Sequence, residues 1–203
     1  MRTHGWAGST PVDDDEAAKR IVMAAGELID DGVTSVNIRQ IAQKLSISRQ
    51  TVYRYFPDTD ALVRAAAEHA TDEFLRGLAD SLRGLTDPAE ATVEGIAVTY
   101  ERLRAHRRFG ILFAPAENGR FIAVVTSPEA ITLGKVIVEQ FDVDWDQFGW
   151  TADDLDELVE MMLRMVQSLL ADAGDPPRSP AELRRYLHRW VAPAIQGRCR
   201  PPV

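Results

Sequence analysis

The 203-residue sequence has a single cysteine, Cys199, and no apolar run close to the 18 residues that a membrane-spanning helix needs. One thiol excludes an intramolecular disulfide framework and a cysteine-based zinc site. The N-terminal residues 1–6 lack the apolar core of a secretory signal. We therefore expect a cytoplasmic protein with no membrane partner.

Common enzyme motifs are missing as well. The sequence has no Gly-x-Gly-x-x-Gly, no phosphate-binding Gly-x-x-x-x-Gly-Lys and no Gly-x-Ser-x-Gly. None of its four histidines has a glutamate three residues earlier, which excludes the di-iron signature of helical bundles. We expect no enzyme activity, no catalytic residues, no metal site and no cofactor.

Acidic residues outnumber basic ones by 31 to 23, yet residues 33–57 contain no acidic residue. Within this basic segment Arg39, Lys44, Arg49 and Arg54 give a charge of +4, so the other 19 basic and 31 acidic residues leave the rest at −12. Such a distribution predicts one face for an anionic partner and a body that repels it. Chance clustering on a solvated surface is the alternative.

Helical patterns fill most of the chain. Apolar residues recur at helical spacing between capping residues and glycine or proline stops, which predicts an all-α protein of about nine helices. Residues 1–12 are rich in Gly, Ser, Thr and Pro and are expected to form a disordered arm. Residues 13–57 form a first domain, residues 58–196 a second domain that begins with a linking helix at 58–82, and residues 197–203 a tail.

The basic segment contains a helix-turn-helix pattern. Residues 37–44 and 48–54 fit two short helices separated by residues 45–47, so that the second helix can enter a major groove. Ser48 is the expected N-cap of the second helix. The exposed side of that helix then carries Arg49, Gln50, Thr51, Tyr53 and Arg54. These residue types bond phosphates and base edges.

The stretch Ile41–Phe56, IAQKLSISRQTVYRYF, closely resembles the tetracycline-repressor (TetR) family of bacterial regulators. The resemblance covers roughly residues 13–62. It implies a ligand-responsive transcriptional regulator, a repressor that binds a palindromic operator in double-stranded DNA as a homodimer and leaves it when a small molecule binds. The alternative is a small-molecule-binding protein whose helix-turn-helix no longer binds DNA usefully.

The resemblance also implies roles for individual residues. Tyr53 and Thr59 would hold phosphates, and Arg39 would reach a phosphate or a base. Tyr55 is either a DNA contact or part of the core. The full candidate DNA-binding set is Arg39, Ser48, Arg49, Gln50, Thr51, Tyr53, Arg54, Tyr55 and Thr59, in which Arg49, Gln50 and Thr51 would meet base edges.

Two positions depart from the family pattern. Ser46 stands where the family usually has a glycine, in a turn that often needs a left-handed backbone, so we expect a strain of about 1 kcal/mol there. Thr59 stands where the family usually has a lysine that touches a phosphate, and Asp58 and Asp60 flank it. We expect a weaker grip on the DNA backbone than is usual for the family.

Apolar residues of the helix expected at 151–173 span about 200° of its circumference, although about 100° suffices to pack on one core. The resemblance implies a homodimer formed by the last two long helices, and we assign residues 151–174 and 179–195 to its interface. A fully intramolecular core is the alternative. The candidate interface residues are Leu158, Met162, Val166, Leu169, Leu183, Leu187 and Trp190.

The family binds its effector in the middle of the chain. The candidate ligand-binding residues are Ile96, Thr99, Tyr100, Leu103, Phe109, Phe113, Phe121, Trp145, Met162 and Met165. They have apolar surfaces and few charges, which favours a hydrophobic or aromatic small molecule, and the methionines would give adaptable walls. Taken one at a time, each residue is better explained as part of an ordinary core than as a ligand contact.

Overall fold

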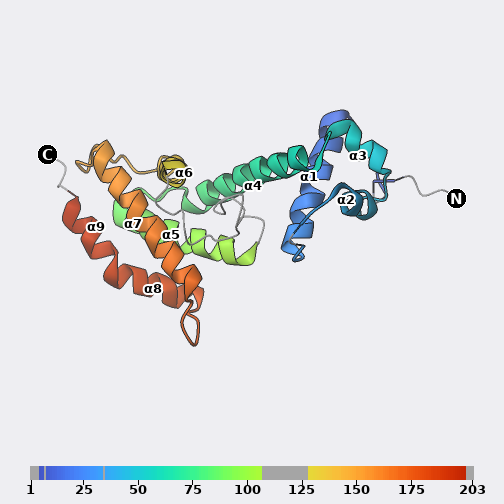
Figure 1. Ribbon diagram of the computed structural model, residues 1–203. Coiled ribbons are helices and arrows are strands. Elements are labelled where there is room, and N and C mark those ends of the chain that lie inside the picture. Colours follow the sequence, from blue (N-terminus) through green and yellow to red (C-terminus); the bar gives the residue numbers. More distant parts are fainter. Residues whose placement is uncertain (1–4, 7, 34, 107–127, 200–203) are drawn as a thin grey trace. The chain divides into compact units, whose positions relative to one another are not determined.

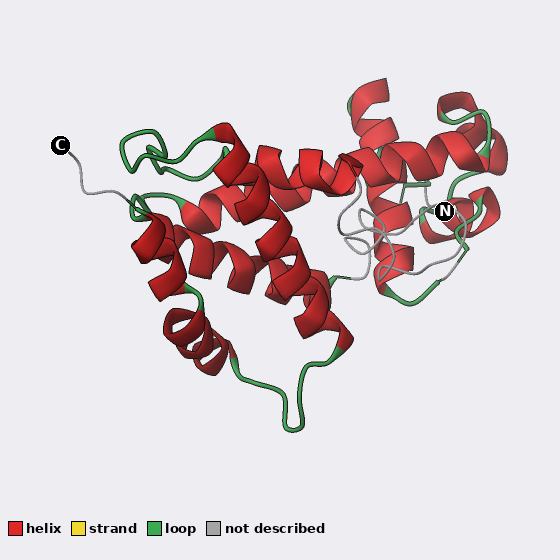
Figure 2. Cartoon of the chain, turned by 60° about the vertical axis from the view of Figure 1, so that its left-hand side comes forward, coloured by secondary structure: helices red, strands yellow, loops and turns green. Residues whose placement is uncertain are grey.

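The computed structural model describes residues 5, 6, 8–33, 35–106 and 128–199. These residues form nine α-helices joined by loops, without a strand (Figures 1 and 2). The helices are α1 (Asp14–Asp30), α2 (Ile38–Lys44), α3 (Arg49–Tyr55), α4 (Thr59–Leu82), α5 (Pro88–Ala105), α6 (Pro128–Val138), α7 (Ala152–Ala171), α8 (Pro180–Trp190) and α9 (Ala192–Arg198). The predicted fold class is confirmed. None of the described helices is long and apolar enough to cross a membrane.

The chain divides into two compact units. Of the described residues, those up to residue 73 and residue 106 belong to unit 1, and residues 74–105 and 128–199 belong to unit 2. The division falls within α4, whereas the sequence analysis set the boundary between residues 57 and 58. The reason is that the first turns of α4 bury Leu62 and Ala66 in the core of unit 1.

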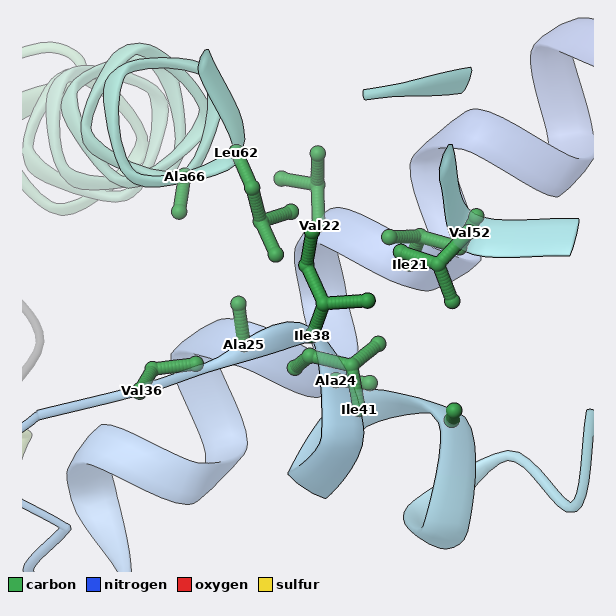
Figure 3. Packing of buried hydrophobic residues seen from close by; sticks show 11 residues of the cluster. Ile21, Val22, Ala24, Ala25, Val36, Ile38, Ile41, Val52, Leu62 and Ala66 are labelled. Carbon is green, nitrogen blue, oxygen red and sulfur yellow. The ribbon is translucent and has the colours of Figure 1, made fainter. Parts of the chain in front are cut away.

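The core of unit 1 is made by α1, α2, α3 and the start of α4. Ile21, Ile41, Val52 and Leu62 are fully buried in it. Figure 3 shows these side chains converging from the surrounding helices. Apolar residues of α2 and α3 therefore pack in one core and fix how the two helices cross.

Polar side chains start the helices of unit 1. Asp13 accepts a 2.7 Å hydrogen bond from the backbone N–H of Glu16 at the start of α1. Asn37 and Gln40 form a reciprocal capping box at the start of α2. Ser48 accepts a 3.0 Å bond from the backbone N–H of Thr51, which confirms it as the N-cap of α3. Each such cap satisfies backbone donors that the helix itself cannot use.

The turn between α2 and α3 has the left-handed conformation that its sequence position predicts. Ser46 has φ = 54°, in the region that glycine adopts more easily than other residues. The backbone N–H of Ile47 donates a 2.9 Å hydrogen bond to the carbonyl oxygen of Ala42 and closes the turn. The serine therefore carries the strain expected of it.

The segment before α1, assigned to a disordered arm from its composition, contacts this turn. The backbone N–H of Trp6 donates a 2.7 Å hydrogen bond to the carbonyl oxygen of Leu45. The Trp6 ring packs edge-on against Tyr55, with 6.4 Å between ring centroids. Trp6 thus adds a partly buried aromatic side chain to the core of unit 1.

Helix α5 lies at the centre of unit 2, where α7, α8 and α9 all pack against it, and α6 packs on α7. Most of its residues are buried, including the polar Thr92 and Thr99. Thr92 donates its hydroxyl to the carbonyl oxygen of Pro88 at 2.7 Å, which satisfies the buried group. A Cβ atom on Gly95 would lie 2.7 Å from the Phe141 ring, so this glycine lets the aromatic ring rest on the helix backbone.

Charged side chains fasten α8 to α5. Arg184 of α8 donates to Glu94 at 2.7 and 2.5 Å and to Glu101 at 2.5 Å, both on α5. The hydrogen bonds that Arg184 donates, first to Glu94 and then to Glu101, hold the pKa of its guanidinium group above the usual value. His188 lies 3.5 Å from Glu90 one turn further along the same contact. The row of carboxylates on α5 therefore fixes which face of α8 is turned inward.

Residues 179–195, taken as a single interface segment in the sequence analysis, form two helices. Helix α8 ends at Trp190 and α9 begins at Ala192, with Val191 between them at φ = −101° and ψ = −50°. Pro193 has no N–H to continue the hydrogen-bond ladder of α8, and its ring excludes a regular helix across this point. The break lets both helices pack on α5.

Candidate nucleic-acid interface

Helix α3 turns one residue inward and most of the others outward. Val52 is fully buried, whereas Arg49, Gln50, Tyr53 and Arg54 are exposed. Thr51 is half-buried, and its hydroxyl lies 2.8 Å from the hydroxyl of Ser48, the N-cap of α3. The exposed face therefore carries two guanidinium groups, an amide and a phenol on one short helix, which are groups that bond base edges and phosphates.

Tertiary contacts reduce the charge of the basic segment. Lys44 lies 3.1 Å from Glu27 and 3.5 Å from Asp31, both on or next to α1. The hydrogen bond that Lys44 donates to Glu27 is the main reason why the pKa of Lys44 is raised. Arg54 pairs with Asp14 at 2.9 Å. Carboxylates from another helix thus neutralise two of the four cations that the sequence grouped together.

The other two cations stay open to a partner. Arg39 near the start of α2 and Arg49 at the start of α3 are exposed and form no ion pair within the part of the chain that the structure describes. Arg49 follows directly after the N-cap, so its side chain projects from the N-terminal end of α3. Helix-turn-helix proteins use this end of the second helix to reach base edges.

Tyr55 is held inside unit 1 by both its ring and its hydroxyl. Its hydroxyl donates a 2.8 Å hydrogen bond to Oδ1 of Asp14, and its ring contacts Trp6. This bond is the first cause of the lowered pKa of Asp14 and of the raised pKa of Tyr55. The Arg54 guanidinium also lies over the Tyr55 ring, 5.3 Å from its centroid. The sequence left Tyr55 as either a DNA contact or part of the core, and in the structure its ring packs within unit 1.

Asp14 is a member of this cluster that the sequence analysis did not single out. The acidic run Asp13–Asp15, which is typical of a helix cap and an acidic first turn, is the only sequence signal at this position. Nothing in the sequence links position 14 to position 54, because 40 residues separate them. The contact exists only because α1 and α3 pack in the same core.

Thr59 is the first residue of α4 and is half-buried. The preceding Asp58 accepts a 2.6 Å hydrogen bond from the backbone N–H of Ala61. This carboxylate occupies a donor that the helix start could otherwise offer to a phosphate. The position therefore provides a hydroxyl but no positive charge.

The described candidate ligand residues of α5, together with Trp145 and Met162, are buried in unit 2. They are Ile96, Thr99, Tyr100, Leu103, Trp145 and Met162. Phe109, Phe113 and Phe121 lie outside the described residues. Trp145 belongs to an aromatic cluster, with ring centroids 6.3 Å from Phe141 and 5.3 Å from Trp150.

Met165 lies elsewhere, in an open groove that α7 forms with the last two helices. The groove has a volume of about 340 Å³. Its lining includes Leu158, Met161, Met165, Trp190 and Ile195. The ion pair between Arg198 and Asp154 borders it, with a 3.1 Å hydrogen bond from Nε to Oδ1. Met165 is thus separated from the buried methionine and tryptophan with which the sequence analysis grouped it.

Most candidate interface residues are buried within their own chain. These are Leu158, Met162, Val166, Leu169, Leu183 and Leu187, each less than 9% exposed. Trp190 differs, because 67% of its surface is exposed. The surplus apolar surface that the sequence predicts for α7 is present at other positions of that helix, Leu155, Met161, Met165 and Leu170, which are only half-buried.

Comparisons with known proteins find a family match within the first unit. Residues 21–66 match the family model described as bacterial regulatory proteins, tetR family. An uncharacterized HTH-type transcriptional regulator of Mycobacterium tuberculosis strain H37Rv is 36% identical over 86 residues, which are 42% of this chain and 43% of the relative. The chain therefore aligns with less than half the length of this curated relative.

Other similarities extend over most of the chain. A second uncharacterized HTH-type regulator of the same strain is 25% identical over 183 residues, which are 88% of this chain and 85% of the relative. A tetR-family regulator from Streptomyces coelicolor superposes with a TM-score of 0.63 at 20% identity, covering 92% of this chain and 82% of that one. The structure of RolR in complex with resorcinol has a TM-score of 0.50 at 25% identity, covering 86% and 94%. These likenesses show that the two units together have the fold of such regulators.

Proposed function

We propose that the chain is a ligand-responsive transcriptional repressor, because residues 21–66 match the tetR family of bacterial regulatory proteins, the family that their sequence resembles. It binds a palindromic operator as a homodimer, and a hydrophobic or aromatic small molecule releases it. The observation that carries the proposal is the outer face of α3, where Arg49, Gln50 and Tyr53 are exposed around the buried Val52. The descriptions of the relatives as transcriptional regulators agree with the prediction that the chain is not an enzyme.

Within this proposal the exposed residues divide by chemistry. Arg49 and Gln50 face base edges, where guanidinium groups pair with guanine and amides with adenine. Tyr53, with 53% of its surface exposed, donates its hydroxyl to a phosphate. Arg39 adds a cation at the start of α2. Thr59 contributes a hydroxyl at the start of α4 in place of a charge.

The proposed effector site lies in unit 2 around the buried face of α5. Thr99 and Tyr100 are the polar residues among the described candidates, and Tyr100 accepts a 2.9 Å hydrogen bond from Arg104. The apolar surroundings favour a ligand with an apolar or aromatic body. RolR, whose fold is similar, binds resorcinol, an aromatic diol, which supports this class.

Release of DNA by the effector follows from linkage. A ligand that binds better to the state with low DNA affinity must weaken DNA binding by the same factor by which DNA weakens ligand binding. Typical coupling of about 1–3 kcal/mol corresponds to about 5- to 150-fold in affinity. Helix α4 contributes buried residues to both units, which supports it as the connecting element.

The proposed dimer surface is shifted from the residues that the sequence suggested. Six of those residues are already packed within their own subunit. We keep the seventh candidate, the exposed Trp190, and add the half-buried Met161 and Met165 in place of the other six. All three line the groove beside α7. Aromatic residues and methionine are enriched at protein–protein interfaces, and a two-fold arrangement brings the same surface from each subunit together.

A binding titration tests the function directly. The purified chain is titrated against the DNA upstream of its own gene and against a random duplex of equal length, at two salt concentrations. We expect at least a thousandfold preference for one upstream segment. Compounds that raise the melting temperature are then added, and we expect at least one hydrophobic compound to lower operator affinity. Equal affinity for both duplexes would contradict specific DNA binding, and unchanged operator affinity with every stabilising compound would contradict induction.

A second candidate function is a small-molecule-binding protein that has lost useful DNA binding. The specific observation in its favour is the pairing of Lys44 and Arg54 with carboxylates, together with a threonine at position 59. The same titration distinguishes the two, because this candidate predicts stabilising ligands and no operator.

A further inference from the structure

Asp14 lies within reach of the proposed DNA-binding face, and its position carries an inference that rests on the DNA-binding function proposed above. We infer that Asp14 is a built-in competitor of DNA phosphates for Arg54 and thereby sets how tightly each DNA-binding unit holds DNA. The motivating contact joins the first turn of α1 to the last turn of α3.

The geometry is that of an anion occupying a phosphate site. Nη2 of Arg54 lies 2.9 Å from both carboxylate oxygens of Asp14. A phosphate offers a guanidinium group the same pair of negatively charged oxygens. While Asp14 holds Arg54, the guanidinium group cannot give that bond to the DNA backbone. DNA must displace the carboxylate to take that bond, and a phosphate that uses the remaining N–H groups of Arg54 meets a cation whose charge Asp14 already offsets.

The carboxylate is fixed in position by a second donor. The Tyr55 hydroxyl bonds Oδ1 of Asp14 at 2.8 Å, and the Tyr55 ring is braced by Trp6. Arg54 also lies over the Tyr55 ring. The contact is thus part of a small cluster that holds both the acid and the base in place, rather than a chance meeting of two mobile side chains.

The pair is nevertheless weak enough to be displaced. The side chains of Arg54 and Asp14 are 65% and 69% exposed, and exposed ion pairs contribute little to stability because water screens them. Asp14 therefore lowers DNA affinity without abolishing it. From the usual strength of exposed pairs, we expect removing its charge to tighten binding about two- to fivefold per DNA-binding unit.

The chain offers a matched control at the next residue. Asp15 is also an exposed carboxylate in the first turn of α1, and it makes no ion pair or hydrogen bond within the described part of the chain. Asp14→Asn and Asp15→Asn remove the same charge from the same helix end. Asparagine at position 14 can still accept a hydrogen bond from the Tyr55 hydroxyl, so the packing of the Tyr55 ring is retained.

The experiment measures binding of the full chain to a fluorescent random-sequence duplex of about 30 base pairs at low salt, by anisotropy, with folding checked by thermal melts. We expect Asp14→Asn to bind two- to fivefold more tightly than Asp15→Asn. In an Arg54→Gln background, the Asp14→Asn substitution should increase the affinity for the duplex by no more than the Asp15→Asn substitution does. This cycle isolates the contribution that passes through Arg54.

Three outcomes overturn the inference, and they differ in what else they affect. If wild type binds the duplex but the two asparagine variants bind equally, Asp14 acts only as a distant charge and the proposed function stands. If Asp14→Asn increases DNA affinity by the same factor with and without Arg54, the competition does not involve Arg54. If neither wild type nor any variant binds DNA at low salt, both this inference and the proposed function are wrong.

Discussion

A Cβ atom on Gly5 would lie 2.6 Å from the carbonyl oxygen of Ser46, so the chain before α1 touches the turn between α2 and α3 with bare backbone. No side chain fits between the two segments. The adjacent hydrogen bond from Trp6 to Leu45 holds the contact at 2.7 Å. The helix-turn-helix is therefore supported from outside at its most strained residue, Ser46.

Replacing Ser46 with glycine should stabilise the protein. The residue has φ = 54°, where a side chain costs on the order of 1 kcal/mol that glycine avoids, less a part lost to the greater freedom of glycine in the unfolded chain. We expect an increase of up to about 1 kcal/mol in the free energy of unfolding in urea. Ser48→Gly is the control, since this N-cap has φ = −77° and should lose a few tenths of a kcal/mol. A loss of stability in Ser46→Gly would contradict strain at the turn.

Replacing Arg49 with alanine should relax sequence discrimination. If Arg49 reads a base, its loss costs about 1–3 kcal/mol on the operator and far less on random DNA. Tyr53→Phe removes a phosphate contact and should weaken both complexes about equally. Titration of each variant against both duplexes measures the ratio. An unchanged operator-to-random ratio in Arg49→Ala would exclude base readout by this residue.

Introducing lysine at position 59 should strengthen backbone binding. Thr59 opens α4, and a cation there adds about one phosphate contact, which tightens binding and steepens the dependence of log K on log salt by about 0.9. Val63→Lys is the control, because it adds the same charge one turn further along at an exposed position. Equal slopes for both lysine variants would show that the start of α4 does not approach the phosphates.

Replacing Trp190 with arginine should break the homodimer. The side chain is 67% exposed beside the groove lined by Met161 and Met165, so the change should leave the subunit folded while opposing the apolar contact. We expect light scattering to give the monomer mass and operator affinity to collapse, because one unit cannot span two half-sites. Val136→Arg, at another exposed apolar position, should remain dimeric. A Trp190→Arg dimer with normal DNA binding would move the interface elsewhere.

Removing Arg184 should destabilise unit 2 more than removing its neighbour. Arg184→Ala leaves Glu94 and Glu101 facing one another without their shared cation, which we expect to cost about 1–3 kcal/mol in urea unfolding. Arg185→Ala removes a side chain that is 74% exposed with one long ion pair of 3.9 Å, and should change stability by less than about 0.5 kcal/mol. Similar losses for the two variants would mean that the bridge to α5 adds nothing.

Local sequence was enough to locate the helices of unit 1 and the helix-turn-helix motif, but not the break between α8 and α9. Helix starts depend on residues a few positions apart, such as Ser48 with Thr51, so capping signals located them well. The helix-turn-helix depends on the spacing of apolar residues, of which Val52 and Ile41 proved fully buried. The left-handed turn at Ser46 followed from its place in the motif.

Only the tertiary structure decided which of those residues remain available to a partner. Asp14 reaches Arg54 across 40 residues, and Glu27 reaches Lys44, so the segment counted as +4 from sequence keeps only two unpaired cations within the described chain. Likewise the apolar stripe of α7 could face its own core or a second subunit, and packing on α5 placed Leu158 inside and left Met161 half-buried. Periodicity fixes the face of a helix, but charge pairing and burial depend on residues that are close only after the chain has folded.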